Sequence, residues 1–262
     1  MSETAQTTQT TRKAARYGMV VDLDKCTGCG ACMVACAVEN NVAPAAPGAD
    51  DRTGITWMRV YEMRNGADYP ASRSIFVPMP CQQCDHPPCE SVCPQKAVEY
   101  DKDTGIVGQI PVRCLGCRYC MVACPYHARA FNWWDPSWPE GMEATLNPDV
   151  STRMRGVVEK CNFCHHRLQA ARARAALEGR DTVRADEYLP ACVEACPVGA
   201  ITFGDLADPA SAVSVQSKAE GGFRFLEKLG TAPKITYRSR QAWVQEMGQR
   251  GAPPPAEEVT HG

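Results

Sequence analysis

The sequence has no long apolar run, no strong charge imbalance and none of the short motifs on which most enzyme chemistry depends. No stretch approaches the roughly 18 to 20 uninterrupted apolar residues of a membrane-spanning helix. The 28 basic and 30 acidic side chains give a formal net charge of −2, so no broad field attracts nucleic acid or anionic lipid. A nucleophile motif, a phosphate loop and a dinucleotide fingerprint are missing. These absences predict a chain without substrate chemistry of its own.

The two ends of the sequence also lack informative features. Residues 1–16 are polar, without an apolar run or a twin-arginine pair, so we expect no secretory signal. We expect this segment to be a disordered tail, because it has no periodic apolar residues with which to pack. The segment from Gly251 onward has the same character. Both ends are predicted to be surface extensions and not sites.

Cysteine, by contrast, is abundant: the chain has sixteen. The cysteines form four groups of similar spacing, which is an internal repeat. In chain order the groups are Cys26, Cys29, Cys32 and Cys36; Cys81, Cys84, Cys89 and Cys93; Cys114, Cys117, Cys120 and Cys124; and Cys161, Cys164, Cys192 and Cys196. Three groups end in Cys-Pro and continue similarly, as PQKAV, PYHARAF and PVGAITF. The spacing has to decide between disulfides, zinc and iron–sulfur clusters.

Around the cysteines the pattern indicates short strands and short helices. Residues typical of strands occur in YGMVVDL, GITWMRVYEM, SIFVPM and AITF. The segment EYDKDTGIVGQ has a turn between two apolar stretches and predicts a hairpin between groups two and three. Alanine and arginine predict a helix from about Cys164 to Glu178. Elements this short predict an α+β fold in which bound groups form part of the core.

The spacing favours iron–sulfur clusters. Groups one and three have the run C-x2-C-x2-C-x3-C, which is typical of bacterial two-cluster ferredoxins. Small residues in TGCGAC and LGCRYC allow backbone amides to approach cluster sulfurs. Zinc sites usually use two cysteine pairs separated by a longer loop; a zinc scaffold without a redox role is therefore the alternative. A disulfide framework is disfavoured, because cysteines this close together pair only with strain.

In the ferredoxin pattern, the last cysteine of a group ligates the cluster of the partner group. Applied here, the pattern joins groups two and three, and groups one and four. We therefore predict four [4Fe-4S] clusters and no catalytic residue. The predicted ligands are Cys26, Cys29, Cys32 and Cys196 for cluster 1; Cys36, Cys161, Cys164 and Cys192 for cluster 2; Cys81, Cys84, Cys89 and Cys124 for cluster 3; and Cys93, Cys114, Cys117 and Cys120 for cluster 4.

This pairing predicts two interlocked ferredoxin-like units, the second inserted in the first. The first unit comprises residues 17–75 and 155–206, and the second comprises residues 76–154. Residues 207–262 are predicted to be a long C-terminal extension that contacts partners.

The four groups resemble the four-cluster ferredoxin-like subunits of complex iron–sulfur molybdoenzymes. The resemblance spans about residues 17–206 and is carried by DKCTGCGACMVACAVENN, PCQQCDHPPCESVCPQKA, RCLGCRYCMVACPYHARAFNW, EKCNFCHHRL and PACVEACPVGAITFGDL. NPDVSTRMRGVVEKCNFC and LEKLGTAPKITYR are most similar to iron–sulfur subunits of menaquinone reductase (Qrc) complexes and alternative complex III. Polysulfide, tetrathionate and sulfite-converting relatives are close alternatives. Some relatives replace the second cysteine of group three and hold a three-iron cluster; this chain keeps Cys117, so no [3Fe-4S] cluster is expected.

The resemblance implies a non-catalytic electron-transfer subunit of a respiratory complex. Its partners would be an integral membrane, NrfD-like, quinone-binding subunit and a molybdopterin-type or multihaem cytochrome subunit. The implied location is peripheral on the bacterial inner membrane, with the periplasmic face favoured over the cytoplasmic face. A free soluble polyferredoxin is the alternative of a different class. The near-neutral charge argues against it, because diffusing carriers often use strong charge for steering.

Other residues beside the cysteines have two interpretations each. Histidine ligates Rieske clusters, but in this chain cysteine already fills every ligand position beside His86, His165 and His166. The tryptophans of NWWDPSWPEG fit either a docking patch or ordinary packing. Four cations adjoin cysteines, and they either stabilise a reduced cluster or belong to a solvated face: Lys25, Arg113, Arg118 and Lys160.

Overall fold

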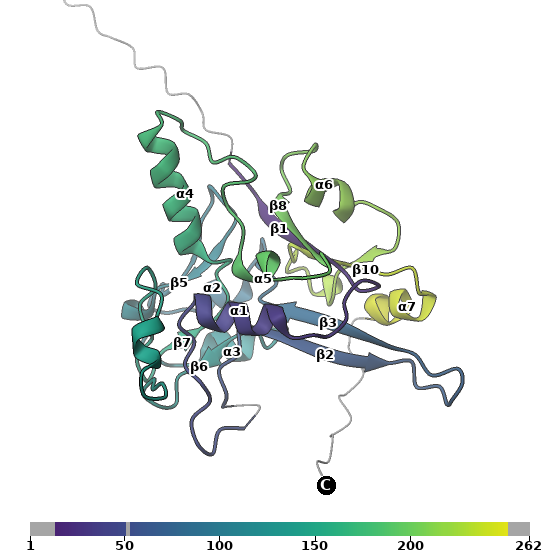
Figure 1. Ribbon diagram of the computed structural model, residues 1–262, viewed down its shortest axis with the longest axis horizontal. Helices are drawn as coiled ribbons and strands as arrows, with labels where there is room; N and C mark the ends of the chain where they lie inside the picture. The colour runs from purple at the N-terminus through teal and green to yellow at the C-terminus, as the bar shows by residue number, and fades with distance from the viewer. Residues whose placement is uncertain (1–13, 51–52, 251–262) are drawn as a thin grey trace, which may run out of the picture.

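The computed structural model describes residues 14–50 and 53–250. In this part, the chain forms a mixed α and β structure with one four-stranded sheet and three two-stranded sheets. The helices are short, and α4 (His165–Leu177) stands out along one side of the molecule (Figure 1). No helix in the described residues is long and apolar enough to cross a bilayer.

The element bounds follow the chain order. The strands are β1 (Tyr17–Asp22), β2 (Met58–Arg64), β3 (Ser74–Pro80), β4 (Val98–Tyr100), β5 (Val107–Gln109), β6 (Ala130–Phe131), β7 (Val158–Glu159), β8 (Ile201–Asp205), β9 (Gly222–Phe223) and β10 (Ile235–Arg238). The other α-helices are α1 (Ala31–Glu39), α2 (Pro88–Ser91), α3 (Tyr119–Ala123), α5 (Ala191–Glu194), α6 (Ala212–Ser217) and α7 (Ala242–Arg250). Short 3-10 turns lie at Pro111–Arg113, Met142–Thr145 and Glu227–Leu229.

These bounds confirm the elements expected from composition. The four predicted strands are β1, β2, β3 and β8, and β4 pairs with β5 in the expected hairpin. Helix α4 begins after Cys164 and ends before Glu178. It is helical because alanine and arginine favour that state, and it buries Leu168, Ala171 and Ala175.

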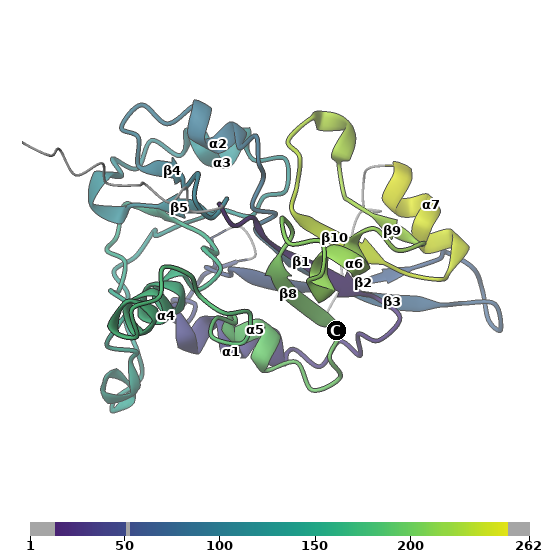
Figure 2. The ribbon, with the colours of Figure 1, turned by 90° about the horizontal axis from the view of Figure 1, so that it is seen from above.

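The largest sheet has the strand order β8-β1-β10-β9 (Figure 2). Strand β1 is antiparallel to β8 and parallel to β10. Met19, Val20 and Val21 of β1 are at most 1% exposed, so the strand is covered on both faces. A continuous apolar run is the sequence pattern of such a central strand.

The segment after residue 206 differs from the predicted extension. Strands β9 and β10 belong to the main sheet, and Ile235 and Tyr237 of β10 are fully buried. Residue 206 is therefore not a boundary between the core and an extension. At the other end, Ala15 and Arg16 are hydrogen-bonded to the backbone of Asp103 and the side chain of Asp85, so the predicted tail does not reach residue 16. Residues 1–13 and 251–262 lie outside the described residues.

A second, smaller core lies at the end of the molecule that holds α2, α3, β4 and β5 (Figure 2). Its buried residues are Cys89, Val98, Val107, Cys120 and Val158. Four of these fall within the predicted inserted segment, 76–154. Val158 belongs to β7, which pairs with β6, so this core also uses a strand from beyond that segment.

Candidate metal centres

All four cysteine groups contain the same local turn. The residue before the second cysteine has a positive φ in each group: 72° at Gly28, 49° at Gln83, 75° at Gly116 and 57° at Phe163. This left-handed conformation bends the chain sharply and lets both cysteines point to one side. Glycine adopts it without strain, whereas burial holds the side chains of Gln83 and Phe163, both 0% exposed.

A second turn follows each of the three Cys-Pro pairs. The third residue after the cysteine again has a positive φ, at Lys96, His127 and Gly199. The backbone N–H of the next residue, always alanine, then donates to the cysteine sulfur. These donors are Ala97 to Cys93 (3.2 Å), Ala200 to Cys196 (3.3 Å) and Ala128 to Cys124. The repeated residues PQKAV, PYHARAF and PVGAITF thus fold into one kind of sulfur-binding turn.

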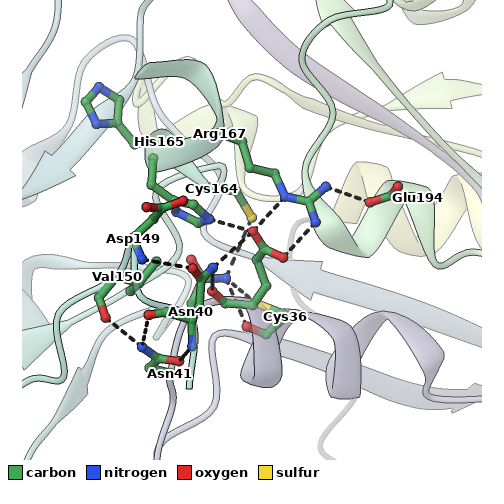
Figure 3. Close-up of polar contacts among 12 residues, drawn as sticks. Cys36, Asn40, Asn41, Asp149, Val150, Cys164, His165, Arg167 and Glu194 are labelled. Atoms are coloured by element: carbon green, nitrogen blue, oxygen red, sulfur yellow. Dashed lines mark hydrogen bonds and ion pairs between the residues drawn. The ribbon is translucent and has the colours of Figure 1, made fainter. Parts of the chain in front are cut away.

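The first group reaches a similar result with a side chain. No proline follows Cys36, so α1 continues to Glu39. Asn40, four residues after Cys36, donates Nδ2 to the backbone carbonyl of Cys36 at 2.9 Å (Figure 3). The same nitrogen lies 3.6 Å from Cys164 Sγ and 3.9 Å from Cys36 Sγ. The amide nitrogen thus approaches two cysteine sulfurs, whereas in the other groups an alanine N–H approaches one.

The structure brings together the four sets of cysteines predicted from the ferredoxin pattern, which we call quartets 1 to 4 after the predicted clusters. Quartets 1 and 4 each line one small cavity. In quartet 2, burial and then the thiols of Cys161, Cys192 and Cys164 raise the pKa of Cys36 well above its ordinary value. In quartet 3, burial and the other three thiols, with Cys81 the strongest, raise the pKa of Cys84 to about 12.

Thiols of neighbouring quartets shift one another's pKa values, and these effects indicate the order of the quartets. Cys32 of quartet 1 acts on the pKa values of Cys36 and Cys192 in quartet 2. Cys81 of quartet 3 is the thiol with the largest effect on Cys161 of quartet 2. Cys89 of quartet 3 acts in turn on Cys120 of quartet 4. The quartets therefore form a series of neighbours, 1-2-3-4.

Exposure differs between the ends and the middle of this series. All eight cysteines of quartets 2 and 3 are buried. Quartets 1 and 4 each have one exposed thiol, at Cys29 and Cys117. The inner quartets are thus shielded from water, whereas each outer quartet reaches the surface.

The residues present fit iron–sulfur clusters. Burial, and then repulsion from the other thiols, raises the pKa values of Cys36 and Cys84, and a cationic iron core would remove this cost. The described part of the chain has no set of three or more His, Cys, Asp or Glu residues arranged for one metal ion. Two buried donors of Arg129, Nε and Nη2, lack an oxygen or nitrogen partner, and they lie among thiols of quartets 3 and 4. Such donors suit the sulfurs of a bound cluster.

A polar network surrounds quartet 2 (Figure 3). Arg167 of α4 donates to both carboxylate oxygens of Glu39 at 2.7 and 2.6 Å, and to Glu194 of α5 at 2.6 Å. These hydrogen bonds are the main reason that the pKa of Glu39 lies below its ordinary value. The network joins α1, α4 and α5, which all hold cysteines of quartet 2 or flank them.

The histidines have other partners. His166 Nε2 lies 2.5 Å from Glu39 Oε1, and His165 Nε2 lies 2.9 Å from Gln169 Nε2. His86 is exposed. None of the three lines the cavities of quartets 1 and 4.

The cations singled out from the sequence occupy different surroundings. Lys160 is buried, and its ammonium donates to the carbonyls of Val107 and Cys161. Arg118 is exposed, and its guanidinium lies over the rings of Phe131 and Trp133. For Trp133, packing is thus the observed interpretation.

Two functional candidates were missed in the sequence, Arg129 and Asn40. Arg129 could have been found by aligning the residues after the three Cys-Pro pairs, where it is the only charge at its position. Asn40 gives no such signal in the sequence. Its role depends on its place at the C-terminal end of α1, which brings it close to Cys164. Its contact with Cys164 joins residues 124 positions apart.

Comparison with known proteins agrees with this geometry. The family described as 4Fe-4S dicluster domain matches residues 72–138, and the family described as 4Fe-4S binding domain matches residues 17–38. The iron–sulfur cluster-binding subunit of menaquinone reductase from Nitratidesulfovibrio vulgaris is 53% identical over 89% of this chain and 92% of its own length. The chain belongs to this family of iron–sulfur subunits.

Other members of the family are more distant. Hdr-like menaquinol oxidoreductase iron–sulfur subunit 1 of Archaeoglobus fulgidus is 37% identical, over 86% of this chain and 84% of its own length. Protein NrfC of Escherichia coli is 35% identical, over 84% of this chain and 79% of its own length. The names of two of the three relatives describe iron–sulfur subunits of a menaquinone reductase and of a menaquinol oxidoreductase, and the resemblance noted in the sequence is thereby confirmed.

Proposed function

We propose that this iron–sulfur subunit relays single electrons through four [4Fe-4S] clusters. Its two partners would be a membrane, NrfD-like, quinone-binding subunit and an extrinsic redox subunit, of a molybdopterin or multihaem type. The observation that carries the proposal is the series of four cysteine quartets, with one exposed thiol at each end. An insulated middle with two accessible ends suits a relay between two partners.

Under this proposal, quartets 1 to 4 ligate clusters 1 to 4. Cys117 completes quartet 4, so that cluster has four irons and a [3Fe-4S] cluster is absent. The clusters lie in two interlocked ferredoxin-like units, the second inserted in the first, with β9 and β10 completing the first. When bound, a cluster supplies one-electron redox chemistry, with a potential that depends on charge, hydrogen bonds and exposure.

The protein's own contribution is to hold and insulate the thiolates. The turns after the Cys-Pro pairs donate backbone N–H groups to cysteine sulfurs, and Asn40 does so for quartet 2. Burial of the inner cysteines excludes water from the middle of the relay. No side chain of the chain is assigned a step in substrate chemistry.

Exposed apolar side chains at one end of the series support a lasting partner. Val112, Leu115, Tyr119 and Val122 are all more than half exposed, and each lies within two residues of a cysteine of quartet 4. Apolar groups gathered at the surface favour protein contacts over solvent. We infer a peripheral position on the bacterial inner membrane, with the periplasmic face favoured. A subunit of a polysulfide-, tetrathionate- or sulfite-converting molybdoenzyme is the alternative complex.

A redox titration monitored by low-temperature electron paramagnetic resonance tests the proposal on the anaerobically purified complex. We expect four one-electron [4Fe-4S] transitions, no three-iron signal, and copurification with membrane subunits. Elution of the native chain alone, near its mass of 28.6 kDa and away from membranes, would favour a free polyferredoxin. A colourless chain without these transitions would favour a zinc scaffold.

A further inference from the structure

One buried arginine occupies a position that equivalent turns fill with an aliphatic residue. The fifth residue after the cysteine of each Cys-Pro pair is Val98, Arg129 or Ile201. All three are buried, with exposed fractions of 2%, 6% and 6%. Because the three turns share the positive φ and the alanine donor described above, these positions are equivalent. The local backbone therefore does not require a charge at Arg129.

The side chain of Arg129 lies between quartet 3 and quartet 4. Its Nη1 donates to Gln109 Oε1 at 2.8 Å. Its other two donors, Nε and Nη2, have no hydrogen-bond partner among the described residues and lie near the thiols of Cys89 in quartet 3 and Cys120 in quartet 4. Arginine keeps its positive charge in proteins. Arg129 is therefore a cation held between two quartets.

A buried cation is costly unless negative charge lies near it. In the described part of the chain, Arg129 donates to an amide oxygen, and its unpartnered donors lie near cysteine sulfurs. Bound clusters supply the missing charge, because each cube with its four thiolates is an anion. The buried position of Arg129 therefore fits neighbouring cysteines that hold such groups.

We propose that Arg129 is a positioning residue that raises the reduction potentials of clusters 3 and 4. The proposal rests on the ligand assignment of the proposed function. One electron from the donor subunit enters a cluster; no bond forms or breaks, and the cluster becomes more negative by one charge. A fixed cation stabilises this reduced state more than the oxidised state, and little water is present to screen it. Hydrogen bonds to cluster sulfurs act in the same direction.

Two variants separate charge from packing. Arg129→Gln and Arg129→Lys both keep a long side chain with N–H donors, and only the lysine keeps the charge. The readout is the set of midpoint potentials in the complex, from a titration monitored by electron paramagnetic resonance. For Arg129→Gln we expect two of four transitions to become harder to reduce by at least about tenfold, which is about 59 mV for one electron. For Arg129→Lys we expect less than a third of that shift.

Two further variants serve as references. Arg113→Gln removes an exposed cation next to Cys114 of quartet 4, and we expect a smaller shift because water and salt screen its charge. Cys117→Ser changes a ligand of cluster 4 alone, so the transition that it perturbs must be one of the two shifted by Arg129→Gln. A shift equal to that of Arg129→Gln in the Arg113→Gln variant would contradict a special role for the buried position.

The outcomes distinguish this inference from the proposed function. Four transitions in the wild-type complex with unchanged potentials in Arg129→Gln would overturn the role of Arg129 and leave the relay intact. Fewer than four transitions in the wild-type complex would overturn the relay itself. If Arg129→Gln fails to assemble, the midpoint potentials of Arg129→Lys decide. Potentials near those of the wild type support the proposal. Clusters that are about tenfold harder to reduce, a shift of about 59 mV, overturn it.

Discussion

The inner and outer cysteine quartets use the same local turns but have different surroundings. All eight inner cysteines are buried, whereas Cys29 and Cys117 of the outer quartets are exposed. Each group still bends through a left-handed residue before its second cysteine. The repeat therefore fixes how thiols converge, and the packing around each quartet fixes whether it meets water. In a relay, convergent thiols hold the clusters. Burial keeps water away from electron transfer between inner clusters, and exposure allows outer clusters to exchange electrons with partners.

The largest difference between inner and outer quartets is expected on removing a ligand. Cys192 of quartet 2 is 4% exposed and lies among hydrophobic core residues, so Cys192→Ser should prevent stable assembly of the chain. Cys29→Ser should yield a folded chain with at most about four irons fewer. Iron content and soluble yield after anaerobic purification measure both effects. Equal yields from the two variants would contradict the comparison.

A glycine pair tests how tightly an outer quartet is held. A Cβ at Gly116 would collide with the carbonyl oxygen of Gly156, whereas one at Gly30 meets no atom within 4 Å. Both glycines have positive φ values, 75° and 76°, so both variants share the cost of a left-handed alanine, about 1 kcal/mol. We expect Gly116→Ala to lose more than about 2 kcal/mol in total, because a backbone clash is added. Thermal unfolding under anaerobic conditions measures the difference; equal losses would mean that the loop near Gly156 can yield.

The network at inner quartet 2 should have a smaller effect. Glu39→Gln replaces a carboxylate bonded twice by Arg167, and we expect a loss of about 1.5 kcal/mol at neutral pH, typical of a hydrogen bond to a charged group. Since Arg167 holds the pKa of Glu39 below the ordinary 4.5, this stability is present above that pH. It is lost as the pH falls through the lowered pKa.

Thermal unfolding of the Glu39 and Glu39→Gln forms is compared between pH 7 and pH 5, with His166→Gln in both chains because the imidazole of His166 also contacts the carboxylate. The difference in stability should be constant over this range. A difference that shrinks as the pH falls would show that the Glu39 carboxylate is not held by Arg167. Arg167→Gln is a matched variant, since it removes the same pair from the other side.

The smallest expected effect is that of Asn40. Asn40→Ala removes the side-chain donor to Cys36 and Cys164, and we expect a loss of about 1 kcal/mol together with a more negative potential for one cluster. The neighbouring variant Asn41→Ala removes bonds to the carbonyls of Asn147 and Val150. It should lower stability without that shift. A titration of both variants decides, and equal potentials would assign Asn40 a purely structural role.

Local patterns predicted much of the fold and the convergence of the cysteines. Strand β1 and helix α4 follow from composition over a few residues, and the cysteine spacing indicates the turns. The position of strand β10 in the main sheet could not be predicted. Its four residues, Ile235–Arg238, pair in parallel with β1 from the opposite end of the chain, and such pairing leaves no local signal.

The electrostatic part of the candidate site was the least predictable. The cations adjoining cysteines in the sequence include Arg118, which is exposed and packs on aromatic rings. Arg129, five residues from the nearest cysteine, is buried among the thiols. Sequence adjacency does not report burial, and burial determines how strongly a charge acts. Comparison of the repeats within the chain is the better guide, since it isolates Arg129 against Val98 and Ile201.

The proposed relay requires that sixteen cysteines ligate four cubane clusters. Iron and acid-labile sulfide can be measured per chain in the anaerobically prepared complex. We expect about sixteen irons and about sixteen sulfides attributable to this subunit. A content near four metal ions without sulfide, or iron well below this level with all cysteines reduced and reactive, would contradict it.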